Sequence, residues 1–472
     1  MKFLLIIPDG VGIRNFLCTS FIDQLLNHGE VTVWHTLHDA TLTVHRERWG
    51  ASVRWCALPA FREGLAERVL RQAKIFAQIH WRYHQDAGDV QLRFRRPRGR
   101  WTSRLVTIAA HALGRLHAHP KGLARLDRRH AGATLRAGYL VSFESFLAQE
   151  QPDIVFCTHQ RASRAVPAML AARKLARPTA TFIYSWDNLP KGRMAVHADD
   201  FLVWSDYMKQ ELLDYYPEID PGRVTVVGTP QFEHYFNSHL VEPRATFLSG
   251  LGLDPARPVV CFSGDDQTTS PHDPVYLEDL AIQLRRQPPE QRPQILFRRC
   301  PVDLSDRYDP VLDRYPEIIS SPPAWIAEPG AEWTNIVPTP DDVALLVNVV
   351  AHCDGVINVG STMALDFAIL GKPAVYVAYD PPGLNGRGIS IHDLYRLPHL
   401  KTVHQLQPVH WVHAAEELGP AVLHALTHPE EKAPARHAWL EQQVLPPLDQ
   451  ASRRLTEALV RIAHQHRKDP SP

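Results

Sequence analysis

The segment from Cys353 to Tyr379 constrains the fold of this chain more than any other part of it. An apolar, β-branched run ends at Gly360, Ser361 and Thr362 follow, and Pro373 then precedes a second apolar run. This order predicts a strand, a turn, a short helix and a second strand. Backbone N–H groups at the start of a helix lack partners within it, so the turn is a candidate anion site. The alternative is a structural strand–helix turn in which Ser361 caps the helix.

Asp366 indicates that the ligand of this candidate site is a nucleotide and not a simple anion. It lies four residues after Thr362, so the two side chains project from about the same face of the predicted helix. A carboxylate one turn inside a phosphate-binding helix is placed to accept hydrogen bonds from a ribose. The turn and Asp366 together are therefore a candidate nucleotide site.

Short apolar strands alternate with helices through both halves of the chain. The predicted strands are 3–7, 31–34, 154–158, 181–185, 201–204 and 224–227 in the first half, and 259–263, 294–298, 355–359 and 374–378 in the second. Such alternation indicates parallel sheets covered by helices. We predict an α/β protein with two Rossmann-like domains, residues 1–238 and 239–435, whose parallel sheets face a cleft between them. A helical tail over 436–472 is expected to pack back on the body.

Length and composition agree with a globular protein of two or three domains. The chain has 472 residues, and domains commonly have about 100–200. A hydrophobic content of 44% favours packed cores over disorder. The six cysteines are scattered without a Cys-x-x-Cys pair, which favours reduced thiols over disulfides or zinc. The apolar start is too short for a signal peptide, and no membrane span is found. We expect a cytoplasmic protein that is either free or peripheral on the inner face of the cytoplasmic membrane.

A strongly basic stretch from Arg93 to Arg129 lies within a predicted helical insertion at about 60–150. It holds eleven lysines and arginines against one acid, Asp127, with apolar residues such as Trp101 interleaved. The pattern is typical of a basic amphipathic segment on an anionic membrane surface or a phosphorylated lipid. The alternative is a solvent-exposed basic face of a helical insertion. No nucleic-acid recognition module accompanies the stretch, so nucleic acid is not predicted as a partner.

Two loops in the second half carry further candidates for phosphate binding. Arg298 ends the predicted strand 294–298, where its guanidinium could form a fork with a diphosphate. The alternative for Arg298 is an ordinary surface arginine. Ser263 and Gly264 begin a polar loop after another strand, and that loop either contacts phosphate or only forms a turn.

In the first half, three residues after a predicted strand could bind an acceptor. Trp186 offers a stacking plane, Asp187 a carboxylate and Asn188 an amide, which together could hold and deprotonate a sugar-like hydroxyl. Asp187 could equally cap a turn. His159 is a second candidate base, although a lone histidine is more often structural, and Asp9 is a third.

Several common enzyme classes lack their motifs in this sequence. Gly10 and Gly12 start a dinucleotide fingerprint, but Asn15 stands where its third glycine is required. A helix is expected over 16–26 after this turn. No P-loop lysine pattern, His-Glu-x-x-His or Gly-x-Ser-x-Gly occurs. A nicotinamide or flavin enzyme is therefore not predicted.

Several of these motifs together resemble bacterial GT-B glycosyltransferases of surface polysaccharide synthesis, which include relatives of CDP-glycerol glycerophosphotransferase-like enzymes. The matching segments are 12–15, 185–188, 201–204, 226–232, 298–301 and 360–373. Cys300 departs from the pattern, because it stands in place of the histidine of an Arg-x-His-Pro motif. Residues 39–150 are largely unmatched in the resemblance.

The resemblance implies roles for individual residues. The implied donor side has Gly360, Ser361 and Thr362 on the diphosphate, Asp366 on the ribose and Arg298 neutralising phosphate charge, with Ser263 and Gly264 on the same rim. The implied acceptor side comprises Arg14, Asn15, Trp186 and Asn188. Enzymes of this fold generally work without a bound metal, because the helix dipole and basic residues stabilise the leaving group. No metal and no cofactor are predicted besides a nucleotide-sugar co-substrate.

The predicted function is the transfer of a sugar from a nucleotide-diphosphate donor to a cell-surface polysaccharide or lipid-linked acceptor. Asp187 is the favoured base, with His159 and Asp9 as the other candidates. One alternative is a polyol-phosphate transferase that uses a CDP-activated donor. Another is a non-catalytic scaffold with the same fold, an interpretation that Cys300 favours.

Overall fold

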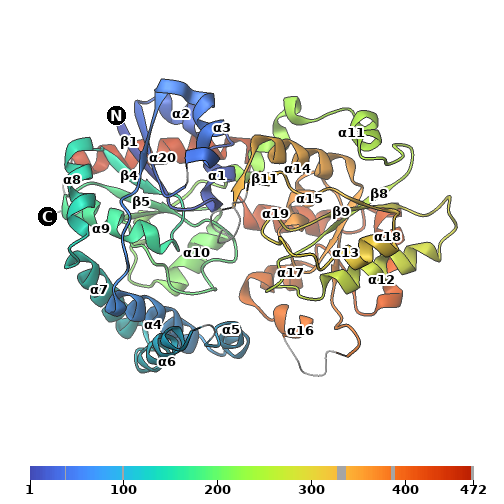
Figure 1. Cartoon of the computed structure of the whole chain (residues 1–472), viewed down its shortest axis with the longest axis horizontal. Helices are drawn as coiled ribbons and strands as arrows, with labels where there is room; N and C mark the ends of the chain where they lie inside the picture. The colour runs from blue at the N-terminus through green and yellow to red at the C-terminus, as the bar shows by residue number, and fades with distance from the viewer. Residues whose placement is uncertain (38, 98–99, 327–335, 384–388, 469–472) are drawn as a thin grey trace. The chain divides into compact units, whose positions relative to one another are not determined.

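The chain divides into two compact units, and each is described here by itself. The computed structural model describes residues 1–37, 39–97, 100–326, 336–383 and 389–468, so Arg98 of the basic stretch lies outside the described residues. Unit 1 comprises Met1–Gln231 and Gln443–Pro472, and unit 2 comprises Phe232–Gln442. Figure 1 shows the two units, with the chain coloured from blue to red.

Unit 1 is built on a seven-stranded parallel sheet with the order β3-β2-β1-β4-β5-β6-β7. The strands are β1 (Lys2–Ile7), β2 (Glu30–His35), β3 (Val53–Ala57), β4 (Ile154–Cys157), β5 (Thr179–Phe182), β6 (Asp200–Val203) and β7 (Val224–Val226). The strand order reverses between β1 and β4, because the chain first adds strands on one side of β1 and later on the other. At such a switch point the loops diverge and leave room for a ligand at the carboxyl ends of the strands.

Both faces of this sheet are covered, which explains its continuous apolar strands. Leu4 and Ile6 of β1 join a buried cluster with α8 (Leu140–Glu150) and α9 (Val166–Lys174). On the other face, the ring of Phe156 lies 5.6 Å from that of Phe16. The helix predicted over 16–26 is in fact two helices, α1 (Val11–Phe16) and α2 (Phe21–Leu26). The break occurs where Thr19 donates its hydroxyl to the Asn15 carbonyl and accepts from the Phe21 N–H.

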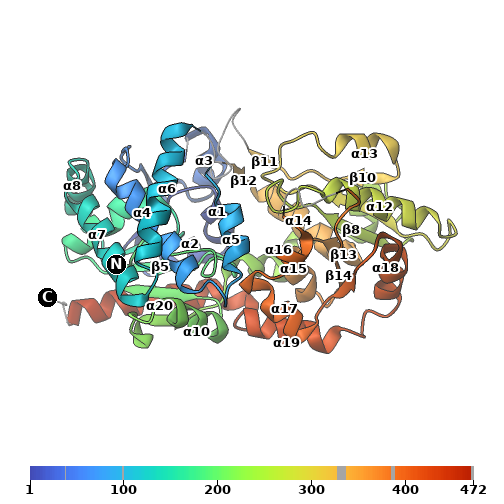
Figure 2. The same ribbon diagram turned by 90° about the horizontal axis from the view of Figure 1, so that it is seen from below.

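A helical insertion separates β3 from β4. Its helices are α4 (Leu65–Trp81), α5 (Gly88–Phe94), α6 (Trp101–Leu116) and α7 (Pro120–Leu135). Figure 2 shows α4, α5 and α6 side by side, and α4 contacts both α6 and α7. Gly114 makes the α4–α6 contact close, since a Cβ there would come within 2.7 Å of the Ala73 carbonyl and the Phe76 side chain. The insertion therefore has a small apolar core of its own.

A buried charge cluster attaches this insertion to the rest of unit 1. Lys74 of α4 places Nζ 3.1 Å from the Asp127 carboxylate of α7, and Arg193 donates from Nε to the same carboxylate at 2.8 Å. His197 lies 3.0 Å from Asp127, and Lys74 Nζ also donates to the Ala195 carbonyl at 3.2 Å. The side chains of Lys74, Asp127 and Arg193 are 0%, 10% and 1% exposed. Lys74 and Arg193 are therefore almost wholly removed from bulk water, and Asp127 supplies a counter-charge to both.

Unit 2 is built on a six-stranded parallel sheet with the order β10-β9-β8-β13-β14-β15. Its strands are β8 (Val259–Ser263), β9 (Gln294–Arg298), β10 (Ile318–Ser320), β13 (Gly355–Asn358), β14 (Ala374–Val377) and β15 (His410–Val412), and a separate antiparallel pair is formed by β11 (Trp325–Ile326) and β12 (Val337–Pro338). The strand order reverses between β8 and β13. The loops after these two strands therefore stand at the switch point of this sheet.

The remaining helices surround the two sheets. They are α3 (Asp39–Trp49) and α10 (Asp206–Tyr215) in unit 1, and α11 (Arg244–Gly250), α12 (Asp273–Arg285), α13 (Asp309–Arg314), α14 (Pro340–His352), α15 (Met363–Ile369), α16 (Ile391–Leu394), α17 (Lys401–Leu406) and α18 (Leu418–Thr427) in unit 2. Within the described ranges, no helix is long and apolar enough to cross a membrane.

The C-terminal tail is shared between the two units. Helix α19 (Ala433–Gln443) belongs to unit 2, where Trp439 donates from Nε1 to the Thr402 hydroxyl at 3.2 Å. Helix α20 (Ala451–Lys468) belongs to unit 1 and contacts α2 and β4. Arg454 of α20 donates to the Val227 carbonyl at 3.0 Å. Helix α20 therefore packs in unit 1, which also contains β1.

We predict that Asp127→Asn destabilises unit 1 by about 3–5 kcal/mol, because Lys74 would remain buried without its counter-charge and Arg193 would keep only Glu218. Urea unfolding at neutral pH measures the loss. The matched control is Asp89→Asn, which removes the partner of Arg93 at a pair whose side chains are 38% and 32% exposed. It should cost less than about 1 kcal/mol. Equal losses in the two variants would contradict the assignment.

The effect of Asp127 should also depend on pH. Burial acts to raise its pKa, but the charges of His197, Lys74 and Arg193 prevail and hold the pKa well below the ordinary value of 3.8. A carboxyl group with a lowered folded-state pKa stabilises the fold above its unfolded-state pKa, and this stabilisation is lost as the pH falls through the folded-state value. The difference between wild type and Asp127→Asn should therefore be constant near neutral pH and shrink in acid.

Candidate functional site

The switch point of the unit 1 sheet brings two predicted residues together. Asp9 follows β1 and His159 follows β4, which are neighbouring strands. The Nδ1 atom of His159 lies 2.8 Å from an oxygen of Asp9, and the two side chains are 10% and 6% exposed. When Nδ1 carries the proton, it donates a hydrogen bond to the carboxylate, and the lone pair of the neutral imidazole lies on Nε2. In the described part of the chain, no hydrogen bond occupies Nε2 of His159. The pair has the form of a general base oriented by a carboxylate.

Tyr184 stands beside this pair, just after the end of β5. Its ring centre lies 5.4 Å from that of His159. Desolvation, together with the negative charges of Asp9 and Asp187, raises the pKa of Tyr184 to about 12, although the positive charge of Arg14 opposes the shift. The phenol therefore keeps its proton at neutral pH and can donate a hydrogen bond. Sequence reasoning missed Tyr184, although it directly precedes the segment that carries Asp187.

Asp187 is surrounded by groups that engage its carboxylate. It accepts from the Asn188 amide at 2.9 Å and forms an ion pair with Lys191. Arg161 is also close: burial lowers the pKa of Arg161, while the charge of Asp187 acts to raise it. A general base needs a lone pair that its substrate can reach, and these cations compete for that of Asp187. The carboxylate is better placed to organise the loop than to remove a proton.

Gln160 holds the loops of this site together, and its role was not predicted from the sequence. Its side-chain amide donates to the side-chain oxygen of Asn188 at 3.0 Å and accepts from the Tyr184 backbone N–H at 3.1 Å. Its backbone carbonyl accepts from the Ala195 N–H at 3.1 Å. Gln160 is fully buried. The only signal in the sequence was its place directly after His159, at the end of a strand.

Three predicted acceptor residues lie inside the unit. Trp186 is 4% exposed, Asn188 is 6% exposed and Asn15 is fully buried. The Asn15 amide lies 3.5 Å from the Gln231 side chain, at the limit of a hydrogen bond. The predicted stacking plane requires an open ring face, and the large apolar area of Trp186 is instead removed from water. Arg14 remains half-buried, so it stays accessible.

In unit 2, the sheet register brings the predicted phosphate residues Ser263, Gly264 and Arg298 together. Ser263 of β8 is the register partner of Arg298 of β9, and the Gly264 N–H donates to the Arg298 carbonyl at 2.9 Å. A side chain at position 264 would clash, since a Cβ would lie 2.6 Å from the hydroxyl of Tyr308. The glycine is therefore explained by packing. Ser263 is 5% exposed.

Arg298 is buried in unit 2. The sequence had suggested instead that its guanidinium is available to form a fork with a diphosphate. It is 5% exposed and donates from Nη2 to Asp342 of α14 at 2.8 Å. Asp342 also accepts from Trp325 Nε1 at 2.5 Å and from the Ala324 N–H at 2.9 Å. The Nη1 atom of Arg298 is buried and has no partner among the residues described. Its positive charge is therefore held at the end of β9 by a paired carboxylate.

The Gly360–Thr362 turn follows β13 at the switch point of unit 2. Gly360 has a φ of 65°, a left-handed conformation that favours glycine. The Ser361 N–H donates to the Asn358 side chain at 3.1 Å, and the Ser361 hydroxyl accepts from the Met363 N–H at 3.4 Å. Thr362 is the N-cap residue of α15 and makes no side-chain capping bond. All three turn residues are half-buried, so the turn is accessible and also carries the local capping expected of a structural turn.

Asp366 lies deeper than the turn. It is 2% exposed, and its carboxylate accepts from the Tyr235 hydroxyl at 2.7 Å. Tyr235 was not predicted, because nothing in the sequence connects positions so far apart. A ribose could reach this carboxylate only if Tyr235 moved aside.

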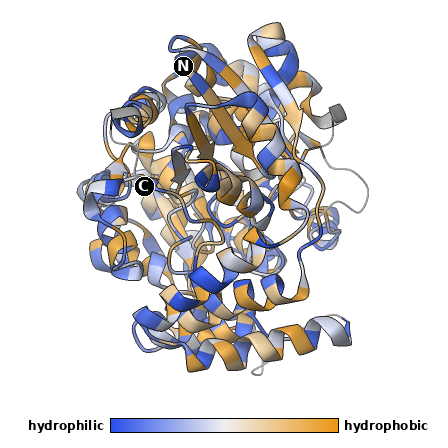
Figure 3. Ribbon diagram, turned by 90° about the vertical axis from the view of Figure 1, so that its left-hand side faces the viewer, coloured by the Kyte–Doolittle hydropathy of each residue, from blue (hydrophilic) through white to orange (hydrophobic). Residues whose placement is uncertain are grey.

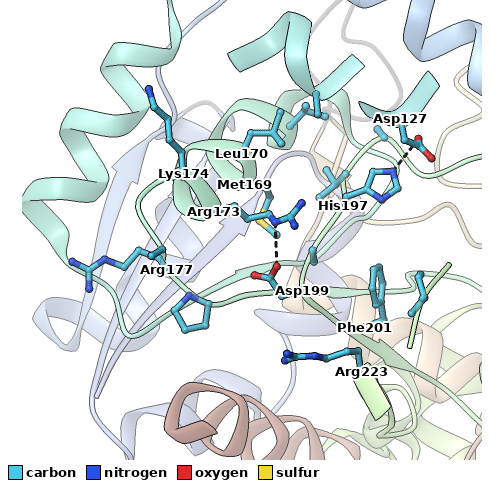
Figure 4. Close-up of a pocket in the computed structure, with 18 of the residues that line it drawn as sticks. Asp127, Met169, Leu170, Arg173, Lys174, Arg177, His197, Asp199, Phe201 and Arg223 are labelled. Atoms are coloured by element: carbon cyan, nitrogen blue, oxygen red, sulfur yellow. Dashed lines mark hydrogen bonds and ion pairs between the residues drawn. The ribbon is translucent and has the colours of Figure 1, made fainter. Parts of the chain in front are cut away.

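A pocket of about 1120 Å³ lies elsewhere in unit 1 (Figure 4). Asp153, Pro178, Asp199 and Arg223 line it, and they immediately precede β4, β5, β6 and β7. It therefore lies at the amino ends of the strands, opposite Asp9 and His159. None of the predicted site residues lines it. Among the residues described, no group of three or more His, Cys, Asp or Glu is arranged to hold a metal ion.

Comparison with solved structures identifies the fold. A glycosyltransferase from Rickettsia africae is 11% identical with a TM-score of 0.51, and the match covers 98% of each chain. A putative UDP-N-acetylglucosamine 2-epimerase from Listeria monocytogenes is 12% identical with a TM-score of 0.54, over 100% of this chain and 97% of that one. UGT89C1 of Arabidopsis thaliana, complexed with UDP-L-rhamnose, is 11% identical with a TM-score of 0.52, over 98% and 99%.

These similarities confirm the predicted fold class. The chain is an α/β protein with two parallel sheets and a GT-B-like fold, which glycosyltransferases and nucleotide-sugar epimerases share. No protein-family model matches the sequence, and no curated protein sequence does. At these identities the likeness concerns the fold alone.

We predict that Gln160→Leu destabilises unit 1 by about 1–3 kcal/mol, because the Asn188 and Tyr184 groups that it satisfies would remain without partners. Urea unfolding measures this cost. The control is Gln210→Leu, at an exposed position of α10 where the side chain donates only to Asp214. The control should change the free energy of unfolding by no more than about 0.5 kcal/mol. A cost at Gln160 as small as that of the control would show that the loops do not depend on it.

Proposed function

We propose that the chain is a nucleotide-sugar-dependent glycosyltransferase in which His159 is the general base. The observation that carries the proposal is the Asp9–His159 pair, with Nδ1 and the carboxylate oxygen 2.8 Å apart, at the switch point of a GT-B-like unit. Ligands of open α/β sheets bind at such points. The structural relatives reported above use nucleotide sugars, which agrees with this class of donor.

In the proposed reaction, Nε2 of His159 takes the proton of an acceptor hydroxyl. The acceptor oxygen then bonds to the anomeric carbon of the donor sugar, and the bond from that carbon to the diphosphate oxygen breaks. The nucleoside diphosphate leaves with the electron pair. Asp9 keeps the imidazole in the required tautomer and stabilises the imidazolium that forms. Tyr184, which keeps its proton, is placed to donate a hydrogen bond to the acceptor.

The proposal assigns the acceptor to unit 1 and the donor to unit 2. Arg14, Asp187 and Asn188 organise the acceptor loops, with Asp187 as a positioning residue and no longer as the favoured base. The half-buried Gly360–Thr362 turn is the proposed contact for the diphosphate. Ser263, Gly264 and Arg298 supply the neighbouring strand ends, and Asp366 contacts the ribose if Tyr235 moves. The acceptor class proposed is a saccharide or lipid-linked intermediate of cell-surface polysaccharide synthesis, which rests on the sequence resemblance.

A second candidate function is the epimerisation of a nucleotide sugar. The similarity to UDP-N-acetylglucosamine 2-epimerases over nearly the whole chain favours it. An epimerase converts its donor without any acceptor, whereas a transferase releases the nucleoside diphosphate only when sugar is transferred or hydrolysed. Product analysis with and without acceptor separates the two functions.

We predict that His159→Ala lowers kcat/KM by about 10²–10⁴-fold, since a positioned general base contributes rate enhancement of that size. The assay measures release of nucleoside diphosphate from a panel of nucleotide sugars with saccharide and lipid-linked acceptors. Asp9→Asn should lower kcat with little change in the donor KM. The matched control is His437→Ala, at a histidine whose side chain is 72% exposed.

Donor binding should survive the loss of the base. A nucleotide at 100 times its Kd stabilises a protein by about 2.7 kcal/mol, so wild type and His159→Ala should show the same nucleotide-induced thermal shift. Full turnover by His159→Ala would reject the proposed base. Formation of an epimeric nucleotide sugar without acceptor would establish the epimerase, and the absence of a thermal shift with every nucleotide would support a non-catalytic scaffold.

A further inference from the structure

Helix α6 of the insertion has two apolar faces, and only one of them is covered. Val106, Ala110 and Gly114 are buried on the side that faces α4. On the opposite side, large apolar side chains are open to solvent: Trp101 is 71% exposed, Leu105 55%, Ile108 56% and Leu116 77%. Their spacing of four, three and eight residues places them along one stripe of the helix. We call this stripe the outer face of α6.

The outer face is unusual among the surfaces described. Monomeric proteins expose single apolar residues commonly, but a contiguous apolar patch indicates an interaction site. Figure 3 shows apolar positions, in orange, on the helices at the lower edge of unit 1. Helix α6 is held there by α4, with a close contact at Gly114.

Every charge in the sequence stretch that carries the outer face is positive. Arg104 and Arg115 are exposed on α6, and Arg96 and Arg100 are exposed just before it. Between positions 93 and 126 the sequence contains no aspartate or glutamate. An apolar stripe with arginines along the same segment suits an anionic membrane surface. The apolar side chains can contact the acyl chains, and the arginines can contact the negative headgroups.

We propose that the outer face of α6 docks on an anionic lipid bilayer. The helix lies in the plane of the interface, with its apolar side chains about 5–10 Å into the boundary between headgroups and acyl chains. The arginines extend to the phosphate level, and Trp101 occupies the interface that aromatic rings prefer. The inference does not depend on the proposed catalytic function.

The charge distribution favours a bilayer over a second copy of the chain. A two-fold contact places the same patch against itself, so it would bring the arginines of the two copies together without any acid to balance them. Docking on anionic lipid instead pairs each arginine with an opposite charge.

The docked face is connected to the candidate acceptor loop within unit 1. Helix α4, which carries α6, donates from Gln78 to the Leu189 carbonyl at 2.9 Å and from Lys74 to the Ala195 carbonyl at 3.2 Å. Arg95, just after α5, donates to the Lys191 carbonyl at 2.6 Å. These contacts hold the segment after Asp187 against the insertion. Docking would therefore place the acceptor loop at a fixed distance from the membrane.

The test is co-sedimentation of the full chain with sucrose-loaded vesicles. Wild type should bind vesicles of phosphatidylcholine mixed with phosphatidylglycerol, and bind pure phosphatidylcholine weakly. Leu105→Glu should lower the partition coefficient at least about tenfold, because it puts a negative charge into the apolar stripe. The matched control is Leu304→Glu, at a leucine of unit 2 that is 64% exposed, which should bind as wild type does.

A second variant examines the electrostatic part of the inference. Arg104→Gln with Arg115→Gln should weaken binding to anionic vesicles and reduce its sensitivity to salt, while the thermal stability stays that of wild type. Absence of wild-type binding to anionic vesicles would overturn the proposal. So would equal binding by wild type and Leu105→Glu. A wild-type dimer that Leu105→Glu converts to monomer, without vesicle binding in either, would show that a second copy covers the face.

Discussion

The buried carboxylate of Asp127 is the constraint on which the arrangement of unit 1 depends. Lys74 and Arg193 are almost wholly removed from water, and the Asp127 carboxylate supplies a counter-charge to both within 3.1 Å, while Arg193 also pairs with Glu218. Helices α4 and α7 must therefore fold together with the segment around Arg193. That segment continues from Asp187 and Asn188, so the insertion and the candidate acceptor loop form one structural piece. An insertion that the sequence resemblance leaves largely unmatched thus helps to hold the candidate acceptor loop in place.

The architecture could be predicted well from the sequence, because parallel strands that are buried on both faces consist of continuous apolar runs. The strands it missed are edge or short strands such as β3 and β15, where polar residues such as Arg54 and His410 interrupt the run. The placement of candidate residues at strand ends was predictable for the same reason. Their pairings were not, because Asp9 with His159 and Asp366 with Tyr235 join positions more than 130 residues apart. Only the folded chain reveals which polar groups already have partners.

Such partners decide between the candidate bases in unit 1. Asp187 and His159 both follow strands, and their sequence context favoured Asp187. In the structure the Asp187 carboxylate is engaged by Asn188 and Lys191, whereas the carboxylate of Asp9 occupies only Nδ1 of His159. Proton transfer requires a lone pair that the acceptor can approach. The same reasoning in unit 2 separates the accessible Gly360–Thr362 turn from Arg298, whose charge is already paired with Asp342.

The outer face of α6 and the Asp9–His159 pair are linked by the helices between them. An acceptor carried on a membrane-embedded lipid is confined to a thin layer at the bilayer surface, so an enzyme that uses it benefits from a fixed height above that layer. The hydrogen bonds from Gln78 and Lys74 to the backbone at Leu189 and Ala195 supply a rigid connection of this kind. A basic apolar helix on a flexible linker would raise the local concentration of the enzyme without setting that height. The rigid attachment of α6 therefore favours positioning over simple recruitment.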